Sequence, residues 1–366
     1  MKIEVVETNV NEVHPSILAW NNSRPDNTPI PLDEILQLDL PVNEIPMATL
    51  FIESTILERE IIVSARNHVM WAQTSRVQNV LEFTYPKELP LECKQYYERQ
   101  RNRMEKAQSM GMRQDEYRKI LPVMANTKYT VNMSMRDLVK LLKYFESLSK
   151  EYSHLSPVLD NSVSAIKELL GNVFGFEYRH TNEYKTKSLL QPIMTPQDGL
   201  VGNVLSLTAR LPLSLRAQLA RHRQLIIEDN LVALMSSDTI LFQDNEMPVD
   251  ICVTGLQQDW RDVLTKRSCW IAHYNLWSPL LNKVEKYLHL GESALPCYFS
   301  GKCPYDGDAK ARYTDEDPNA PCPIHARLYK KSVTTDQLNQ MYFQQAADER
   351  PEFWADEIAG FNNGEA

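Results

Sequence analysis

Two stretches of the chain set the expected architecture: VNMSMRDLVKLL at residues 131–142 can be laid against VTGLQQDWRDVL at residues 253–264. A Pro-Val pair precedes each stretch, at Pro122 and at Pro248. Because self-similarity along a chain indicates repeated structural units, we interpret the sequence as a diverged internal duplication of two rounds. Identity between the two rounds is low, so coincidence is the alternative.

The spacing of apolar residues predicts alternating strands and helices. Strands are expected at residues 1–8, at the start of 48–63, at 206–211 and at 250–254, and helices at the end of 48–63 and over 64–80, 91–120 with a break at Gly111, 132–148, 156–170, 215–230 and 260–288. This pattern indicates the α+β class, with two diverged α/β repeats that carry long helices. The expected domains are repeat 1 with a loop-rich lead-in at residues 1–195, repeat 2 at residues 196–290 and an irregular, acidic, Cys- and His-rich segment at residues 291–366.

The composition is that of a globular protein, with 43% hydrophobic and 24% charged residues among 366. The formal net charge of −9 argues against a protein that coats nucleic acid through a basic face, although local arginine clusters bind small anions within acidic proteins. No apolar run approaches the roughly 20 residues that a membrane-spanning helix needs, and the N-terminus lacks a signal-peptide core. Six sparse cysteines fit a reduced protein, so we expect a cytoplasmic location and no membrane partner.

The segment LPLSLRAQLARHR, residues 211–223, places Arg-His-Arg at the end of an amphipathic run. Arg221 and Arg223 cannot be neutralised and are costly to bury, and their planar forks suit phosphates and planar polar rings. A basic tripeptide is commonly a solvated turn, which is the plain alternative to a binding site.

Four blocks of the chain together resemble the flavin-dependent thymidylate synthases, the ThyX family. Gln218 stands three residues before Arg-His-Arg, as in the family signature. Residues 111–122, GMRQDEYRKILP, resemble the family's Gly-x4-Glu-x-Arg-x2-Leu-Pro block, and an extended run into residues 130–132 and a long helix follow, as in the family. The similarity covers residues 48–170 and 205–290.

The resemblance implies a reductive methylation, in which methylene-tetrahydrofolate gives a one-carbon unit to dUMP and NADPH reduces bound FAD, which passes hydride on. No protein nucleophile attacks the pyrimidine in that scheme, so the protein supplies binding, orientation and charge. The family assembles its site at the junction of several subunits, which implies a homo-oligomer. We therefore expect a transferase that methylates or hydroxymethylates a deoxyuridylate-like pyrimidine nucleotide.

The resemblance also assigns roles to individual positions. The catalytic positions are Gln218, at the edge of the pyrimidine or flavin, and Arg267, which would hold the uracil; the cofactor positions are Arg221, His222, Arg223 and Asn132; and Arg118 would bind the nucleotide. Plain structural roles are the alternatives: Arg118 as an ion-pair partner on a solvated helix, Asn132 as a helix N-cap, and Arg267 with Lys266 as a basic helix face.

The chain departs from the family after Arg-His-Arg. Where the family has a Ser and an Arg that grip phosphate, this chain has Leu231 and Ala233, and only the acidic position is kept, as Asp229. The first round lacks Arg-His-Arg but offers Ser75 and Arg76 close to the vacant phosphate-binding position. We therefore expect one composite site, with Arg118, Asn132, Ser75 and Arg76 from round one and Gln218, Arg221, His222, Arg223 and Arg267 from round two.

A second group of candidate ligands is Cys297, Cys303, Cys322 and His325. Three thiols and one imidazole match a tetrahedral zinc site. The long acidic loop between them has little apolar content, so it needs a cross-link such as a metal ion to hold its structure. The Cys-x5-Cys spacing is wider than in most zinc sites, so an iron–sulfur cluster or inert cysteines stay open. The ThyX family has no such element.

Three functions are open at this point. The leading one is flavin-dependent one-carbon transfer, and the second is a catalytically inactive ThyX-like homologue that binds nucleotides or supports assembly. The lost Ser-x-Arg half favours the second, whereas retention of Gln218 with Arg-His-Arg argues against it, because buried arginines without a ligand are costly. Nucleic-acid binding through the Cys/His segment is the third, and the net charge of −9 disfavours it.

Metal analysis of the purified protein tests the Cys/His segment. We expect wild-type protein to carry about one zinc ion per chain and Cys322→Ser to lose most of it, because a structural zinc site uses all four ligands. Cys93→Ser, outside the segment, should keep the wild-type metal content. Equal zinc in wild type and Cys322→Ser would contradict the site, and a brown protein would indicate iron–sulfur.

Overall fold

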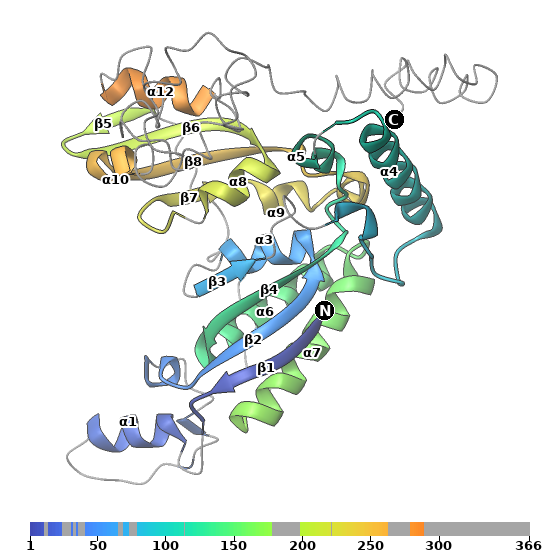
Figure 1. Ribbon diagram of the computed structural model, residues 1–366. Helices are drawn as coiled ribbons and strands as arrows, with labels where there is room; N and C mark the ends of the chain where they lie inside the picture. The colour runs from blue at the N-terminus through green and yellow to red at the C-terminus, as the bar shows by residue number, and fades with distance from the viewer. Residues whose placement is uncertain are drawn as a thin grey trace. The chain divides into compact units, whose positions relative to one another are not determined.

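The computed structural model describes residues 1–10, 14–23, 31, 34–35, 41–64, 69–72, 79–112, 114–177, 198–220, 222–262 and 279–288. Helices and antiparallel strands are mixed along the chain, which confirms the α+β class (Figure 1). The chain divides into two compact units, unit 1 with residues 1–97, 122–191 and 232–243, and unit 2 with residues 98–121, 192–231 and 244–366. Within the described ranges, no helix is both long and apolar enough to cross a bilayer.

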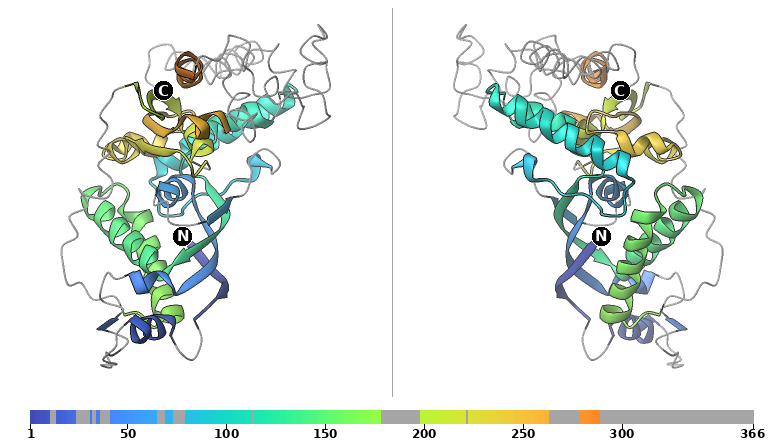
Figure 2. Two further views of the ribbon diagram at one scale, coloured as in Figure 1. Left: turned by 90° about the vertical axis from the view of Figure 1, so that its left-hand side faces the viewer. Right: turned by 90° about the vertical axis from the view of Figure 1, so that its right-hand side faces the viewer.

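The sheet of unit 1 is antiparallel and has the strand order β1-β2-β4-β3. Its strands are β1 (Lys2–Thr8), β2 (Met47–Thr55), β3 (Val69–Ala72) and β4 (Asn126–Ser134). The helical elements of this unit are α1 (Pro15–Ser23), η1 (Pro41–Glu44), α3 (Ile56–Ser64), η2 (Val80–Glu82), the start of α4 (Leu91–Ser109), α6 (Met135–Glu151), α7 (Ser156–Phe174) and η5 (Asp238–Phe242). The views in Figure 2 show the antiparallel pair α6 and α7 along one side of this sheet.

Burial alternates along the central strands of unit 1, which defines a covered face and an open face of the sheet. Leu50 and Ile52 of β2 and Val131 and Met133 of β4 are buried, and the residues between them are half-buried or exposed. The amphipathic helix α6 supplies a matching apolar stripe, with Leu138, Leu141, Leu142, Phe145 and Leu148 buried. The covered face therefore carries the core of this unit.

The sheet of unit 2 is also antiparallel, with the order β5-β6-β8-β7. Its strands are β5 (Gly199–Val201), β6 (Val204–Pro212), β7 (Ile226–Asp229) and β8 (Pro248–Leu256), and its helical elements are the rest of α4, α5 (Gln114–Tyr117), η3 (Arg118–Ile120), α8 (Leu213–Leu219), α10 (Gln257–Asp262) and α12 (Pro279–Leu288). The short helix α9 (Leu231–Leu234) begins at its boundary with unit 1. Trp260 is fully buried and its Nε1 donates to the carbonyl of Leu205 at 3.2 Å, which places it in the core.

Three sequence expectations for helices are wrong, because strand pairing replaces helical periodicity there. Residues 69–72, expected within a helix, form β3 and pair with β4. The helix expected over residues 215–230 ends at Leu219, and β-branched Ile226 and Ile227 pair with β8 instead. The helix expected from Asn132 starts at Met135, because β4 continues to Ser134, whose hydroxyl accepts from the Asp137 N–H as the N-cap.

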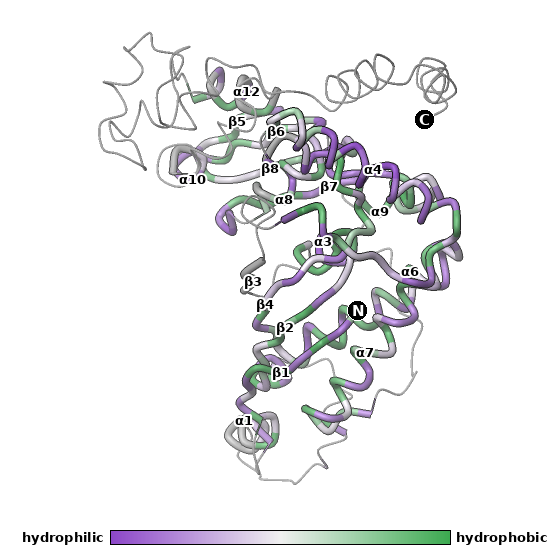
Figure 3. Tube along the Cα trace, turned by 45° about the vertical axis from the view of Figure 1, so that its right-hand side comes forward, coloured by the Kyte–Doolittle hydropathy of each residue, from purple (hydrophilic) through white to green (hydrophobic). Residues whose placement is uncertain are grey.

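Helix α4 and the break after it follow the expected pattern for residues 91–120. Figure 3 shows hydrophilic residues along much of α4, and its buried stripe is Cys93, Tyr97, Gln100, Met104 and Ala107. Gly111 has φ +74°, and the next N–H donates to the Ala107 carbonyl at 3.0 Å. A glycine in the left-handed region ends a helix without steric strain, so α5 begins in a new direction.

The two sheets are equivalent position by position. The strands β2, β4, β6 and β8 each have nine residues, and the β2–β4 pair has the same register as the β6–β8 pair. In β2 and in β3, each residue matches the one 157 positions later, as Met47 matches Val204 and Ala72 matches Asp229. The same offset at both ends also relates the described residues of α3 and α8. Val131 takes the place of Val253, the pairing that the sequence comparison uses. Pro248, however, takes the place of Asn126 and not of Pro122.

Cross-strand ion pairs occupy equivalent positions on the open faces of both sheets, with their charges exchanged. Lys128 of β4 lies 3.8 Å from Glu53 of β2, and Asp250 of β8 lies 3.9 Å from Arg210 of β6. The register matches Lys128 to Asp250 and Glu53 to Arg210. Opposite charges directly across an antiparallel pair stabilise the register whichever strand carries which sign.

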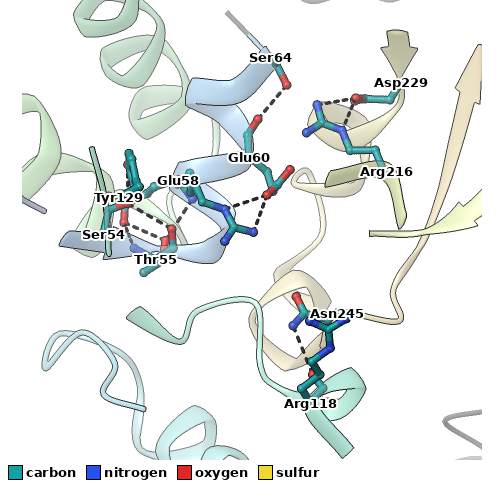
Figure 4. Close-up of polar contacts among 11 residues, drawn as sticks. Ser54, Thr55, Glu58, Glu60, Ser64, Arg118, Tyr129, Arg216, Asp229 and Asn245 are labelled. Carbon is teal, nitrogen blue, oxygen red and sulfur yellow. Dashed lines mark hydrogen bonds and ion pairs between the residues drawn. The ribbon is translucent and has the colours of Figure 1, made fainter. Parts of the chain in front are cut away.

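A buried polar cluster fixes the start of α3 in unit 1 (Figure 4). The Thr55 N–H and hydroxyl donate to Glu58 Oε2 at 2.7 and 2.8 Å, and the Glu58 N–H donates to Thr55 Oγ1 at 3.1 Å, which is a capping box. The Ser162 hydroxyl of α7 donates to Glu58 Oε1. Beside it, the hydroxyls of Ser54 and Tyr129 are hydrogen-bonded at 2.8 Å, and burial raises the pKa of Tyr129. Glu58, only 2% exposed, thereby ties α3 to α7.

The capping box gives a stability prediction. Thr55→Val should lower the free energy of unfolding by about 2 kcal/mol, because it removes a helix cap and one of the donors to a buried carboxylate. Thr130→Val, a matched change at a half-buried position of β4, should alter it by less than about 0.5 kcal/mol. Urea denaturation followed by circular dichroism measures both, and equal effects of the two changes would contradict the role of the box.

Candidate functional site

His222 and Arg223 of the Arg-His-Arg segment lie in a turn between α8 and β7. The His222 N–H donates to the Leu219 carbonyl at 2.9 Å, and the Leu225 N–H donates to the His222 carbonyl at 3.0 Å. Arg223 is exposed and His222 is half-buried with polar contacts of its own. Arg221 and the side chain of Gln218 lie outside the described residues. The turn therefore offers at least one guanidinium to solvent beside a partly shielded imidazole.

Arg118 is buried in unit 2, with only 8% of its surface exposed. It begins η3 in the connection between β3 and β4, next to the equally buried Lys119, and both cations make polar contacts. The expectation of a solvated helix at this position is therefore wrong. Burying a cation is costly without compensating contacts. The two buried cations are therefore integrated into the packing of unit 2.

Asn245 links the turn of Arg118 to the helix that leads into Arg-His-Arg. The Asn245 Nδ2 donates to the Arg118 carbonyl at 3.4 Å, and its backbone N–H donates to the Leu121 carbonyl at 3.1 Å. Its own carbonyl accepts from the Ser214 N–H in the first turn of α8, at 2.9 Å. Sequence reasoning missed Asn245, since only tertiary contact distinguishes it from an ordinary turn residue.

Asn132 lies on β4 of unit 1, on the open face of the sheet. Its Nδ2 donates to the Thr49 hydroxyl of β2 at 3.1 Å. The helix N-cap is Ser134, so the alternative role of Asn132 as a cap is wrong. The equivalent pair in unit 2 is Thr254 with Ser206, whose hydroxyls are 2.9 Å apart. Both sheets therefore keep a polar cross-strand pair at this position.

Arg216 and Asp229 form a buried ion pair that the sequence did not indicate (Figure 4). The Arg216 Nε and Nη2 contact Asp229 Oδ2 at 2.8 and 2.7 Å, and the two side chains are 3% and 10% exposed. Asp229 Oδ1 accepts from the Leu231 N–H at 3.0 Å. Leu231 is itself buried at 2% exposure. This stretch is therefore built into the core.

Several candidate residues lie outside the described residues. They are Ser75, Arg76, Arg267, Cys297, Cys303, Cys322 and His325. In the part of the chain that the structure covers, no group of three His, Cys, Asp or Glu side chains is arranged to hold a metal ion. Cys93 and Cys252 are buried there as free thiols, and burial raises the pKa of both.

The described part of the site suits an anionic or planar polar ligand. Exposed Arg223 and half-buried His222 stand in one turn, and the Arg118 turn is joined through Asn245 to the helix before it. Guanidinium and imidazolium groups bind phosphates and polar rings by charge-assisted hydrogen bonds. In chemical terms this arrangement offers groups that could bind and orient such a ligand.

No protein-family model matches the chain, and no curated protein is similar to it.

The two cross-strand pairs on the open faces give a matched prediction. Thr49→Val and Ser206→Ala should each lower the free energy of unfolding by about 1 kcal/mol, because each removes one partly buried side-chain hydrogen bond. Thermal or urea denaturation of both variants measures this. A loss in only one variant would show that the two pairs are not equivalent.

Proposed function

We propose that the chain is a flavin-dependent one-carbon transferase of the ThyX kind, acting on a deoxyuridylate-like pyrimidine nucleotide. The observation that carries the proposal is the position of Arg118. It belongs to the connection between β3 and β4, yet it is buried in unit 2 and joined through Asn245 to the helix before Arg-His-Arg. Two sequence blocks of the proposed signature, more than 90 residues apart in the chain, thus belong to one unit.

The equivalence of the two sheets supports an origin of the chain by duplication of a ThyX-like unit. Strand order, register and the hydrogen bonds that start α3 and α8 agree. The Ile56 N–H donates to the Ala125 carbonyl, and the Leu213 N–H donates to the Met247 carbonyl, both at 2.9 Å. A duplicated chain carries within itself two copies of a site that a homo-oligomer builds from separate subunits, so each copy is free to lose part of it.

The proposed roles follow the sequence assignment. Arg221, His222 and Arg223 would contact the flavin or the nucleotide, and Asn132 would line the pocket of FAD and the nucleotide. Arg118, Ser75 and Arg76 would hold the nucleotide, and Gln218 and Arg267 would contact the reacting rings. FAD supplies hydride transfer when bound, with NADPH and methylene-tetrahydrofolate as co-substrates. The protein's own contribution is to bind and orient these groups.

A catalytically inactive homologue that still binds nucleotide is the second candidate. One observation favours it: Leu231 is buried in the core, and Asp229 is already bound to Arg216 and the Leu231 N–H. Residues 229 and 231, after Arg-His-Arg, are thus used for packing and internal contacts, and neither side chain can hold a phosphate. In this case ligands bind without turnover.

Calorimetry with dUMP tests whether Arg118 and Arg223 serve one ligand. Arg118→Ala and Arg223→Ala should each weaken dUMP binding about 30-fold, or about 2 kcal/mol, because each removes a charge-assisted hydrogen bond. Arg101→Ala, which removes a half-buried arginine paired with Glu98, should change the affinity by less than about twofold. An effect of only one of the two substitutions would contradict a shared site.

Spectra and product analysis separate the two candidate functions. Yellow protein with flavin absorbance that forms a methylated or hydroxymethylated nucleotide from dUMP, methylene-tetrahydrofolate and NADPH supports the enzyme. Binding of dUMP or FAD without product supports the inactive homologue. A colourless protein that binds neither FAD nor dUMP would overturn both.

A further inference from the structure

Two interactions anchor the turn with His222 and Arg223 on the sheet of unit 2, and these interactions are called fastenings below. The first is the Arg216–Asp229 ion pair, with Arg216 on α8 before the turn and Asp229 at the end of β7 after it. Because Asp229 also accepts from the Leu231 N–H, its carboxylate is fixed on both oxygens. The distance between the two ends of the segment is thereby set by side chains as well as by the β7–β8 pairing.

The second fastening is the side chain of Leu225 against Gly255. Leu225 is fully buried at the end of the turn, and a Cβ at Gly255 would lie 2.5 Å from Leu225 Cδ2. Any side chain larger than a hydrogen atom at this position would require Leu225 to shift. Gly255, on the covered face of β8, therefore leaves the space that the Leu225 side chain fills. The turn is therefore anchored close to Arg223 by apolar packing.

Neither fastening exists at the equivalent positions of unit 1. Arg59 matches Arg216, but Ala72 stands where Asp229 would be, and Met133 stands where Gly255 would be. Arg59 is bound instead by its neighbour Glu60, with Nε and Nη2 at 2.9 and 2.6 Å from Glu60 Oε1. The arginine is thus common to both rounds, while its link across the turn belongs to the round that carries Arg-His-Arg.

A buried ion pair is a poor source of net stability, because desolvation of the two charges offsets most of their attraction. What such a pair does supply is a defined geometry, since an unpaired buried charge would be strongly unfavourable. A glycine within a strand likewise weakens the strand and marks a close approach. Both features generally lower stability. Because both occur around one turn, we infer that the protein needs this turn to keep a defined conformation.

We propose that Arg216, Asp229 and Gly255 are positioning residues, which hold residues 222–225, with His222 and Arg223, in a single conformation that binds an anionic nucleotide or flavin phosphate. The ligand rests on the proposed function, whereas the fixed turn does not. A turn that is already fixed does not have to be ordered when the ligand binds, so the entropic cost of binding is lower.

Limited digestion with trypsin tests the fixed turn without any ligand. Cleavage after exposed Arg223 requires the turn to open locally, and cleavage after Arg101 on α4 reports on general loss of structure. In Asp229→Asn the ratio of the Arg223 rate to the Arg101 rate, measured by mass spectrometry, should rise about tenfold. The matched control Glu60→Gln removes the carboxylate partner of the equivalent Arg59 and should leave the ratio within about twofold of wild type.

Gly255→Ala is the second variant, which keeps the test valid if Asp229→Asn does not fold. The added methyl requires the buried Leu225 side chain to shift, so a rise of the ratio in the same direction is expected. An unchanged ratio in the variants that fold would overturn the proposal, as would an equal rise in Glu60→Gln.

Binding of dUMP then separates this proposal from the proposed function. If both hold, dUMP affinity falls about tenfold in the variants whose turn opens, because the binding conformation is less populated. If the ratio rises but wild-type protein binds neither dUMP nor FAD, the fixed turn stands and the proposed function fails. If wild-type protein binds dUMP and the variants bind it equally well, the positioning role is wrong although the proposed function stands.

Discussion

The pairing of two nine-residue strands in each sheet is the constraint on which the rest of the structure depends. In an antiparallel pair a shift of one residue would move every buried side chain to the open face, so the apolar face of β2 and β4, and that of β6 and β8, permits one register only. That register decides where the helices after β2 and β6 begin, and hence where the turn with Arg-His-Arg lies. The exchanged ion pairs Glu53–Lys128 and Arg210–Asp250 show that the positions persist while the residues change.

The two sheets share strand order and register but differ in individual residues. Where the second round has Asp229 and Gly255, the first has Ala72 and Met133. Asp229 and Ala72 lie at the end of a four-residue strand, whereas Gly255 and Met133 occupy an equivalent core position on the covered face of each sheet. The proposed site is therefore a specialisation of one round, to which the connection of the other round adds the buried turn of Arg118.

Sequence periodicity predicted the long elements well and the short ones poorly. The strands at residues 206–211 and 250–254 and the helices near 135–151 and 156–174 were predictable because apolar residues recur there over many turns or alternations. The strands β3 and β7 have only four residues each, so their local pattern is too short to oppose a neighbouring helix signal. Of the candidate site, Arg-His-Arg and Arg118 were found by resemblance, whereas Asn245 and the Arg216–Asp229 pair were not.

The sequence by itself determined the α+β class, the two similar rounds and the residue types that a polar, anionic ligand would need. These follow from local periodicity and from the chemistry of side chains, which do not require knowledge of distant contacts. Only the tertiary structure decided that Arg118 is buried in the unit of the second round, that Asn132 lies on a strand, and that Arg216 meets Asp229 across the turn. The physical reason is that burial and ion pairing join residues far apart in the chain, and strand pairing outweighs local propensity where the two conflict.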